Sequence, residues 1–318
     1  MLKVIIVGYG EMFTNLIAAA LDAKCDIVGV FRNDYVKYPQ IIRWLKDIFN
    51  PSKEFSYIKS YNIPEIKAKG VNTEEFRKTL LKLNPDIMLV GSWGEKFQKE
   101  TFKIPKIATI NAHPSLLPKY RGPNPYYWAI KNQEKTTGIS FHLMDEKYDT
   151  GAILAQEEIM IYPSDTGKTL KNRMVLTARG VACELLKDLS EDVIIPLQQR
   201  EDISSYYSYP DDLELDFSKT ADENFAKMRA IHPWGDTYFF CKNVALIPDW
   251  NNTIVEENKT NYTEAGTVVD IDNRTKTISI LCSDNKVLKL SRLKLYNKYQ
   301  RIFTSIFIKQ NIKVGDLI

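Results

Sequence analysis

The sequence has few of the residues that bind metals or form disulfides. Only three histidines and four cysteines occur among its 318 residues, and no two cysteines form a CxxC pair. No histidine belongs to an HExxH pattern, in which two ligands share one helix face. We therefore expect neither a metal site nor a disulfide framework, as is usual for proteins of a reducing cytoplasm.

The sequence also lacks an excess of one charge and a long apolar run. Its 43 basic and 40 acidic residues leave a net charge of only +3, which gives no support for broad electrostatic binding to nucleic acid. No window approaches the roughly 20 apolar residues that a transmembrane helix needs. We predict a cytoplasmic protein that does not contact the membrane, with a chain long enough for about two domains.

The first part of the chain predicts a Rossmann-like unit. A continuous apolar run from Leu2 to Val7 ends in Gly8, a helix is expected over residues 11–21, and a second strand over residues 27–31. A dinucleotide fingerprint would need a third glycine, where this sequence has Phe13. The glycines therefore predict a tight turn, and we do not expect NAD binding.

Chemistry-bearing residues gather between residues 110 and 151. Asn111 and His113 end an apolar run and are two residues apart, so in a strand they point to one face. Asp149 follows a second strand-like run, residues 137–144. An amide can hold an oxyanion, an imidazole can move a proton, and a carboxylate can orient the imidazole. Ser115 lies nearby, but no GxSxG elbow surrounds it, so we exclude a serine nucleophile.

Two motifs in this stretch resemble a known family. The segments NAHPSLLPKYRG and DEKYDTG are similar to those of the N10-formyltetrahydrofolate-dependent formyltransferases. That family includes methionyl-tRNA formyltransferase, sugar-nucleotide N-formyltransferases and glycinamide ribonucleotide formyltransferase. The resemblance implies an N-formyltransferase with a Rossmann-like catalytic domain, in which Asn111, His113 and Asp149 are catalytic. It covers about residues 1–240.

The resemblance also implies roles for the catalytic residues. Asn111 and a protonated His113 are expected to stabilise the oxyanion formed when an amine attacks the formyl carbon. Asp149 is expected to hold His113, to help remove the amine proton, and to raise the pKa of the imidazole.

Three segments are implied to bind the folate, which is a co-substrate rather than a metal-dependent cofactor. They follow strand-like runs, where ligands of open α/β sheets bind. Their residues are Trp93, Gly94, Glu95, Lys96 and Phe97; Ser115, Leu116, Leu117 and Pro118; and Asp145, Glu146, Lys147 and Tyr148.

The composition changes near residue 204, where SSYYSYP is typical of a linker. Three short strand-like runs at residues 266–270, 277–281 and 287–290 predict a small β domain, such as a partly open barrel. We thus predict an α/β protein with a formyltransferase domain over residues 1–203, a connector over 204–240 and a β-rich domain over 241–318.

The acceptor amine admits several hypotheses. The GPNPYYW and FHLMDEKYDTG forms look closer to enzymes that formylate dTDP-amino-sugars for surface-glycan or O-antigen synthesis, and these are often homodimers. The sugar would be dTDP-4-amino-4,6-dideoxyglucose or a 3-amino analogue.

Methionyl-tRNA formyltransferase is the first alternative to this acceptor. However, Lys53, Lys59, Lys67 and Lys69 are interspersed with acidic residues, which favours an ordinary solvated surface over an RNA clamp. A formyltetrahydrofolate hydrolase or a silent folate-binding protein is the second alternative. His142 is expected in the wall of the site, and His232 in packing.

Overall fold

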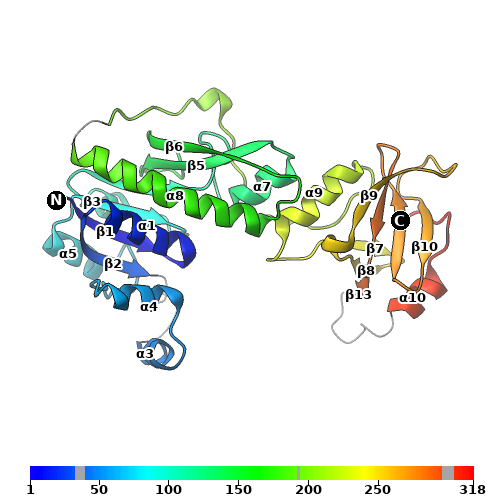
Figure 1. Cartoon of the computed structure of the whole chain (residues 1–318), viewed down its shortest axis with the longest axis horizontal. Helices are drawn as coiled ribbons and strands as arrows, with labels where there is room; N and C mark the ends of the chain where they lie inside the picture. Colours follow the sequence, from blue (N-terminus) through cyan, green and yellow to red (C-terminus); the bar gives the residue numbers. More distant parts are fainter. Residues whose placement is uncertain (33–39, 192–193, 296–303) are drawn as a thin grey trace. The chain divides into compact units, whose positions relative to one another are not determined.

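The computed structural model describes residues 1–32, 40–191, 194–295 and 304–318. The chain forms two compact units (Figure 1). The first contains residues 1–125, 136–160 and 171–208, and the second contains residues 126–135, 161–170 and 209–318. The predicted domain boundaries near residues 203 and 240 stay a prediction.

A six-stranded mixed sheet forms the centre of the first unit. Its strand order is β2-β1-β3-β4-β5-β6; the first four strands are parallel, whereas β5 and β6 are antiparallel additions. The strands are β1 (Lys3–Gly8), β2 (Asp26–Arg32), β3 (Ile87–Gly91), β4 (Ala108–His113), β5 (Thr136–Leu143) and β6 (Ile153–Met160). The helices along the chain are α1 (Gly10–Asp22), α3 (Gln40–Phe49), α4 (Lys53–Ser60), α5 (Glu74–Leu83), α6 (Lys99–Phe102), α7 (Pro125–Lys131) and α8 (Gly167–Ser190).

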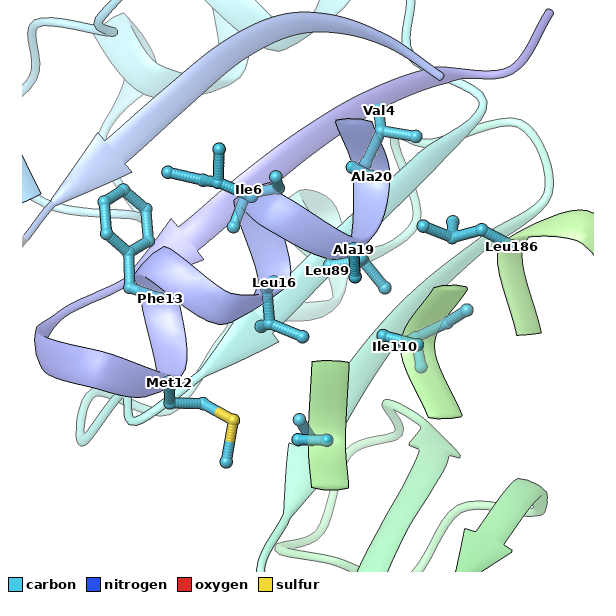
Figure 2. Close-up of a cluster of buried hydrophobic side chains, with 14 of the residues drawn as sticks. Val4, Ile6, Met12, Phe13, Leu16, Ala19, Ala20, Leu89, Ile110 and Leu186 are labelled. Carbon is cyan, nitrogen blue, oxygen red and sulfur yellow. The ribbon is translucent and has the colours of Figure 1, made fainter. Parts of the chain in front are cut away.

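Side-chain alternation along β1 divides the core into two layers. Val4 and Ile6 pack with apolar residues of α1 and α8 on one face, as Figure 2 shows for α1. Ile5 and Val7 pack on the other face with residues of α5, including Phe76. Because successive strand residues point to opposite faces, an uninterrupted apolar run is what a sheet covered on both sides requires.

The order of the parallel strands reverses between β1 and β3. β2 lies on one side of β1, and the chain then continues through β3 and β4 on the other. Ligands of open α/β sheets bind beyond the carboxyl ends of the strands at such a reversal. Asn111 and His113 end β4 at this same edge of the sheet. Phe13, in place of a third glycine, is fully buried beside Gly8.

The second unit is rich in antiparallel strands. One sheet has the order β10-β11-β12-β9 and the other the order β13-β8-β7. Their shared core includes Leu246, Ile278 and Leu288. The elements are α9 (Ala221–Ile231), β7 (Phe239–Cys241), β8 (Val244–Ile247), β9 (Ile254–Glu257), β10 (Val268–Asp272), β11 (Thr277–Leu281), β12 (Lys286–Leu290), β13 (Lys294–Leu295) and α10 (Thr304–Asn311).

These findings confirm an α/β protein with a Rossmann-like first part and a β-rich C-terminal part. The strands expected at residues 277–281 and 287–290 correspond to β11 and β12. Among the described helices, none has both the length and the apolar character that crossing a membrane requires.

Arg32 forms a buried ionic cluster at the end of β2. Its side chain is 2% exposed, and Nη2 lies 2.7 Å from Oδ2 of Asp47. Its Nε donates to Glu65. Burial alone disfavours the guanidinium charge, but the two carboxylates outweigh it and raise the pKa of Arg32. The cluster therefore joins β2 to α3 and to the segment before residue 70.

We expect Arg32→Ala to lower the free energy of unfolding by about 3–5 kcal/mol, because it leaves two poorly solvated carboxylates without a partner. Arg179→Ala is the matched control, since the Arg179–Asp22 pair is about half exposed. The control should cost less than about 1 kcal/mol. Urea denaturation of both variants measures the difference, and equal losses would contradict a structural role for the cluster.

Candidate functional site

The candidate site is built where β4 pairs with β5. The antiparallel register places Asn111 directly opposite His142 and His113 opposite Ser140. Side chains of directly opposed residues share one face of the sheet. Asp149 lies in the loop after β5 and has a left-handed backbone with φ of 57°. One face of the sheet therefore presents an amide, two imidazoles and a carboxylate.

The Asp149 carboxylate is the centre of this cluster. Oδ1 lies 3.5 Å from Nδ1 of His113, 3.5 Å from Nε2 of His142, and 3.4 Å from Nδ2 of Asn111. Oδ2 accepts a 2.9 Å hydrogen bond from the backbone N–H of Gly122. The structure thus brings the three predicted catalytic residues together, while their catalytic role stays a prediction.

Hydrogen bonds to carbonyl groups determine the form of each imidazole. Nε2 of His113 lies 2.8 Å from the Tyr120 carbonyl oxygen, which can only accept, so Nε2 carries the hydrogen. In neutral His113, Nδ1 then has the lone pair and faces Asp149. In His142, Nδ1 donates to the Leu143 carbonyl at 2.8 Å, which leaves Nε2 as an acceptor.

Asn111 uses both amide hydrogens within the cluster. Its Nδ2 lies 3.2 Å from Nε2 of His142 and 3.4 Å from Oδ1 of Asp149. The second distance exceeds that of a normal N–H···O bond, so this hydrogen bond is weak. Breaking this weak hydrogen bond costs less free energy than breaking the one to His142. The hydrogen that faces Asp149 is therefore the one that a substrate oxygen can accept more easily.

Burial changes the expected protonation of His113. Burial lowers the pKa of the imidazole and outweighs the opposing effects of Asp149 and of the Tyr120 carbonyl. The prediction of a raised pKa, and with it a protonated His113 in the resting site, was wrong. It considered the neighbouring charge but not the loss of water around the ring.

Asp149 is ionised at neutral pH. Burial alone would raise its pKa, but attraction to His113 and His142 in their charged forms and the hydrogen bond from the Gly122 N–H together hold the pKa of this carboxyl well below its usual range. The site thus pairs a neutral base with a fixed negative charge. This arrangement accepts a proton at His113 and then stabilises the resulting cation.

Two of the predicted folate segments lie against each other. The Lys96 ammonium lies 5.7 Å from the centre of the Tyr148 ring, and Lys99 pairs with Glu146 at 2.8 Å. Within the first segment, Glu95 accepts a 2.9 Å hydrogen bond from Asn72. In the third segment, Asp145 accepts from Lys147 N, which stabilises the turn. The loops after β3 and β5 therefore contact each other, and the second of them contains Asp149.

The aromatic residues of the first segment differ in their surroundings. The Trp93 ring packs 5.5 Å from Phe31, and its indole N–H finds no hydrogen-bond partner among the residues that the structure describes. A buried donor of this kind suits a ligand acceptor, while folate binding by this segment stays a prediction. Phe97 is only 2% exposed as a whole residue and packs in the core with Val90 and Phe102.

Hydrogen bonds from β5 and β6 stabilise the segment from Ser115 to Pro118. Ser140 Oγ donates to the Ser115 carbonyl at 2.5 Å and accepts from Leu117 N at 3.1 Å. Gln156 Nε2 donates to the Leu117 carbonyl at 3.0 Å. The Ser115 hydroxyl donates to the Lys119 carbonyl at 2.8 Å, which agrees with a structural hydroxyl rather than a nucleophile.

Two features around the cluster were not predicted from the sequence. His142 was expected only in the wall, yet it accepts from Asn111 and faces Asp149. The SSYYSYP segment was predicted to be a linker, but Arg121 N donates to the Ser205 carbonyl at 2.9 Å, and Tyr207 N donates to the Arg121 carbonyl at 3.0 Å. The His142 position could have been found by pairing the two strands, whereas the partners around residue 205 lie too far along the chain to be predicted.

Within the described ranges, no three histidine, cysteine, aspartate or glutamate side chains are grouped so that they could hold a metal ion.

Two family descriptions match the chain. The one described as formyl transferase matches residues 2–182, and the one described as formyl transferase, C-terminal domain, matches residues 208–307. The second match extends past residue 240, where the resemblance inferred from the sequence ended.

Individual relatives agree with this match. Methionyl-tRNA formyltransferase of Clostridioides difficile is 30% identical over 317 residues, 98% of this chain and 97% of that protein. The bifunctional polymyxin resistance protein ArnA of Wigglesworthia glossinidia brevipalpis is 30% identical over 87% of this chain and 44% of its own length.

Among solved structures, an N-formyltransferase from Helicobacter canadensis, in complex with folinic acid and dTDP-3-aminofucose, is 20% identical. It has a TM-score of 0.66 over 93% of this chain and 100% of that one. At this identity the likeness shows the fold alone.

We expect His113 to titrate below 6.5, the ordinary pKa of histidine, because burial favours the neutral ring. Asp149→Asn should lower the pKa further, since it removes the charge that opposes burial. NMR of the ring Cε1 protons over a pH series measures this. With only three histidines, His232→Gln and His142→Gln assign the signals. A wild-type pKa above 6.5 would contradict the prediction.

Proposed function

Because the chain belongs to the formyl transferase family, we propose that it transfers a formyl group to the primary amine of a nucleotide-linked amino sugar. The family membership confirms the predicted enzyme class, an N-formyltransferase, and its donor, N10-formyltetrahydrofolate. The sugar acceptor is our proposal. We take dTDP-4-amino-4,6-dideoxyglucose or its 3-amino analogue as the substrate and surface-glycan synthesis as the use of the product.

The charge of the C-terminal part is the observation that carries the sugar proposal. Residues 209–318 contain 15 basic and 15 acidic side chains, and so have no net charge. Several of the basic residues are already paired, as in Lys286–Asp222 and Lys289–Glu256. Proteins that bind RNA by its backbone concentrate positive charge on one face. A small nucleotide sugar needs no such field.

The segment after β2 supports the same acceptor. Arg32, at the carboxyl end of the strand, is held by Asp47 and Glu65. In α4, Glu54 accepts a 2.9 Å hydrogen bond from Gly10 N at the start of α1. These carboxylates are thus used in contacts within the protein, as expected of an ordinary folded surface rather than of an RNA clamp.

The cluster around Asp149 explains how the transfer proceeds. The acceptor nitrogen attacks the formyl carbon, a C–N bond forms, and the carbonyl electron pair moves to the formyl oxygen. The Asn111 amide hydrogen that faces Asp149 turns to this oxyanion. Nδ1 of His113 accepts the proton from the attacking nitrogen, and Asp149 stabilises the imidazolium.

Collapse of the intermediate restores the site. The bond between the formyl carbon and N10 of the folate breaks, and N10 takes the proton from His113. The products are tetrahydrofolate and the N-formylated sugar, and His113 is neutral again. In this scheme His113 is a base and then an acid, rather than the cation that the sequence analysis expected.

The donor's contacts follow from the same arrangement. We propose that the segments at residues 93–97, 115–118 and 145–148 hold the folate. The Trp93 N–H, which is buried without a hydrogen-bond partner among the described residues, supports this role. The homodimer and the cytoplasmic location stay predictions.

Methionyl-tRNA is the second candidate acceptor. The observation that favours it is the C. difficile methionyl-tRNA formyltransferase, which is alike over almost the whole of both chains. The two hypotheses share the donor and the catalytic cluster and differ only in what carries the amine.

An acceptor screen decides between them. The purified protein and N10-formyltetrahydrofolate are offered dTDP-4-amino-4,6-dideoxyglucose, its 3-amino analogue, a UDP-amino-sugar, Met-tRNA or no acceptor. We expect kcat/KM to be highest for a dTDP-amino-sugar. The N-acetylated form of that sugar serves as a control and should be unreactive, because it has no free amine. Formylation of Met-tRNA alone would favour the second candidate. Formate release that is equally fast without an acceptor would indicate a hydrolase.

We expect Asn111→Ala to lower kcat by at least about a hundredfold, because one oxyanion donor is lost. Folate binding, measured by fluorescence or calorimetry, should be retained because Asn111 is not in the folate segments. Asn132→Ala, on an amide outside the cluster, is the control for amide removal. Turnover of Asn111→Ala within a few-fold of wild type would remove the assignment.

A further inference from the structure

The structure assigns to Gln199 the role of a positioning residue that holds the backbone of Asp149 for catalysis. Gln199 lies 50 residues from Asp149 along the chain and is bonded to it through the side-chain amide. It does not face the cluster itself. The inference rests on the proposed function, because it presumes that the Asp149 carboxylate takes part in the transfer.

The side-chain amide of Gln199 donates hydrogen bonds to the loop on both sides of Thr150. Its Nε2 donates to the Asp149 carbonyl at 2.9 Å and to the Gly151 carbonyl at 2.7 Å. Both hydrogens of one NH2 group are thus used on two carbonyls of a single turn. Since neither carbonyl can donate, the amide cannot bind the loop in the reverse orientation.

Arg121 fixes the other end of the same amide. Oε1 of Gln199 accepts from Nε and Nη2 of Arg121 at 3.2 and 2.8 Å. Arg121 is only 6% exposed, and its guanidinium also pairs with Glu201 at 2.7 Å. The residue after Arg121 is Gly122, whose N–H binds the Asp149 carboxylate. Asp149 is therefore held at its side chain by residue 122 and at its backbone through residues 121 and 199.

Asp149 needs such a clamp because of its backbone conformation. A φ of 57° lies in the left-handed region, which is less stable for residues with a side chain than the right-handed or extended regions. A Cβ at Gly151 would meet the Leu143 carbonyl oxygen, so the loop packs closely against β5. Release of the carbonyls would let the carboxylate move away from His113, and a misplacement of about 1 Å can cost about a hundredfold in rate.

Turnover of Gln199→Ala is the first test, with dTDP-4-amino-4,6-dideoxyglucose and N10-formyltetrahydrofolate as probes. We expect kcat to fall about tenfold to a hundredfold while both KM values stay within about threefold, because Gln199 itself lies outside the segments proposed to hold the folate. The matched control is Gln198→Ala, the same change at the exposed neighbouring glutamine, and it should keep wild-type kcat.

Gln199→Glu separates the contribution of the hydrogen bonds to the loop from that of the hydrogen bonds from Arg121. A carboxylate keeps the length of the side chain and the acceptor for Arg121, but it loses both donors to the loop. We expect it to be as impaired as Gln199→Ala. If Gln199→Glu keeps wild-type kcat, only the Arg121 pair matters and the inference is overturned. This variant also carries the test should Gln199→Ala fail to fold.

A double-mutant cycle with Asp149→Asn shows whether Gln199 acts through Asp149. If it does, adding Gln199→Ala to Asp149→Asn should lower kcat by less than about threefold further. Full multiplication of the two single effects would mean that Gln199 acts elsewhere. Wild-type kcat in Asp149→Asn alone would instead remove the catalytic role of Asp149, and with it the proposed function.

The NMR titration of His113 gives a readout that needs no acceptor. Asp149 and His142 are the titratable groups that face this ring. If Gln199→Ala lets Asp149 move away, the pKa of His113 should fall toward its value in Asp149→Asn, while Gln198→Ala leaves it unchanged. A wild-type pKa in Gln199→Ala contradicts the positioning role even if the acceptor is a different amine.

Discussion

The carboxylate of Asp149 is buried among two imidazoles, an amide and a backbone N–H. Its negative charge affects the orientation or the protonation of each of these partners. When His142 is neutral, its Nε2 and Oδ1 of Asp149 are both acceptors and lie 3.5 Å apart, which alone would be unfavourable. The Asn111 NH2 group lies within 3.4 Å of both and donates to each. The orientation of the Asn111 amide thus follows from the charge beside it.

The mixed topology of the sheet makes this arrangement possible. The parallel strands β1, β3 and β4 bring their carboxyl ends to one edge, which is where an open α/β sheet binds ligands. β5 runs antiparallel to β4, and the register sets His142 directly beside Asn111 and Ser140 beside His113. The chain after β5 folds back, so that Oδ1 of Asp149 lies 3.5 Å from Nδ1 of His113 and 3.5 Å from Nε2 of His142.

Local sequence patterns predicted the elements that depend on local forces. The apolar run of β1 and the helix α1 are specified by neighbours in the chain, and both lie where they were expected. The pairing of residues 111 and 113 on one face followed from strand geometry. The short strands β7, β8 and β13 were not predicted, because each has too few residues for a period to be visible.

The parts of the site that the sequence did not predict depend on distant segments. Ser205 and Tyr207 have the composition of a linker, yet they pair with Arg121, more than 80 residues earlier. No local sequence pattern predicts such a contact, because the pairing uses backbone N–H and C=O groups that nearly every residue has. The pKa of His113 was missed for a related reason. A neighbouring carboxylate can be inferred from a motif, whereas burial depends on all the segments that cover the ring.

Burial and charge act on His113 in opposite directions, and this opposition suits the chemistry. Removal of water lowers the pKa and keeps the resting imidazole neutral, so Nδ1 is ready to accept a proton. Once the proton arrives, the attraction of Asp149 at 3.5 Å is strong, because the same burial lowers the local dielectric. A more exposed histidine would be protonated more easily at rest and stabilised less after transfer. The segments that bury the ring therefore influence the pKa of a residue that they do not contain.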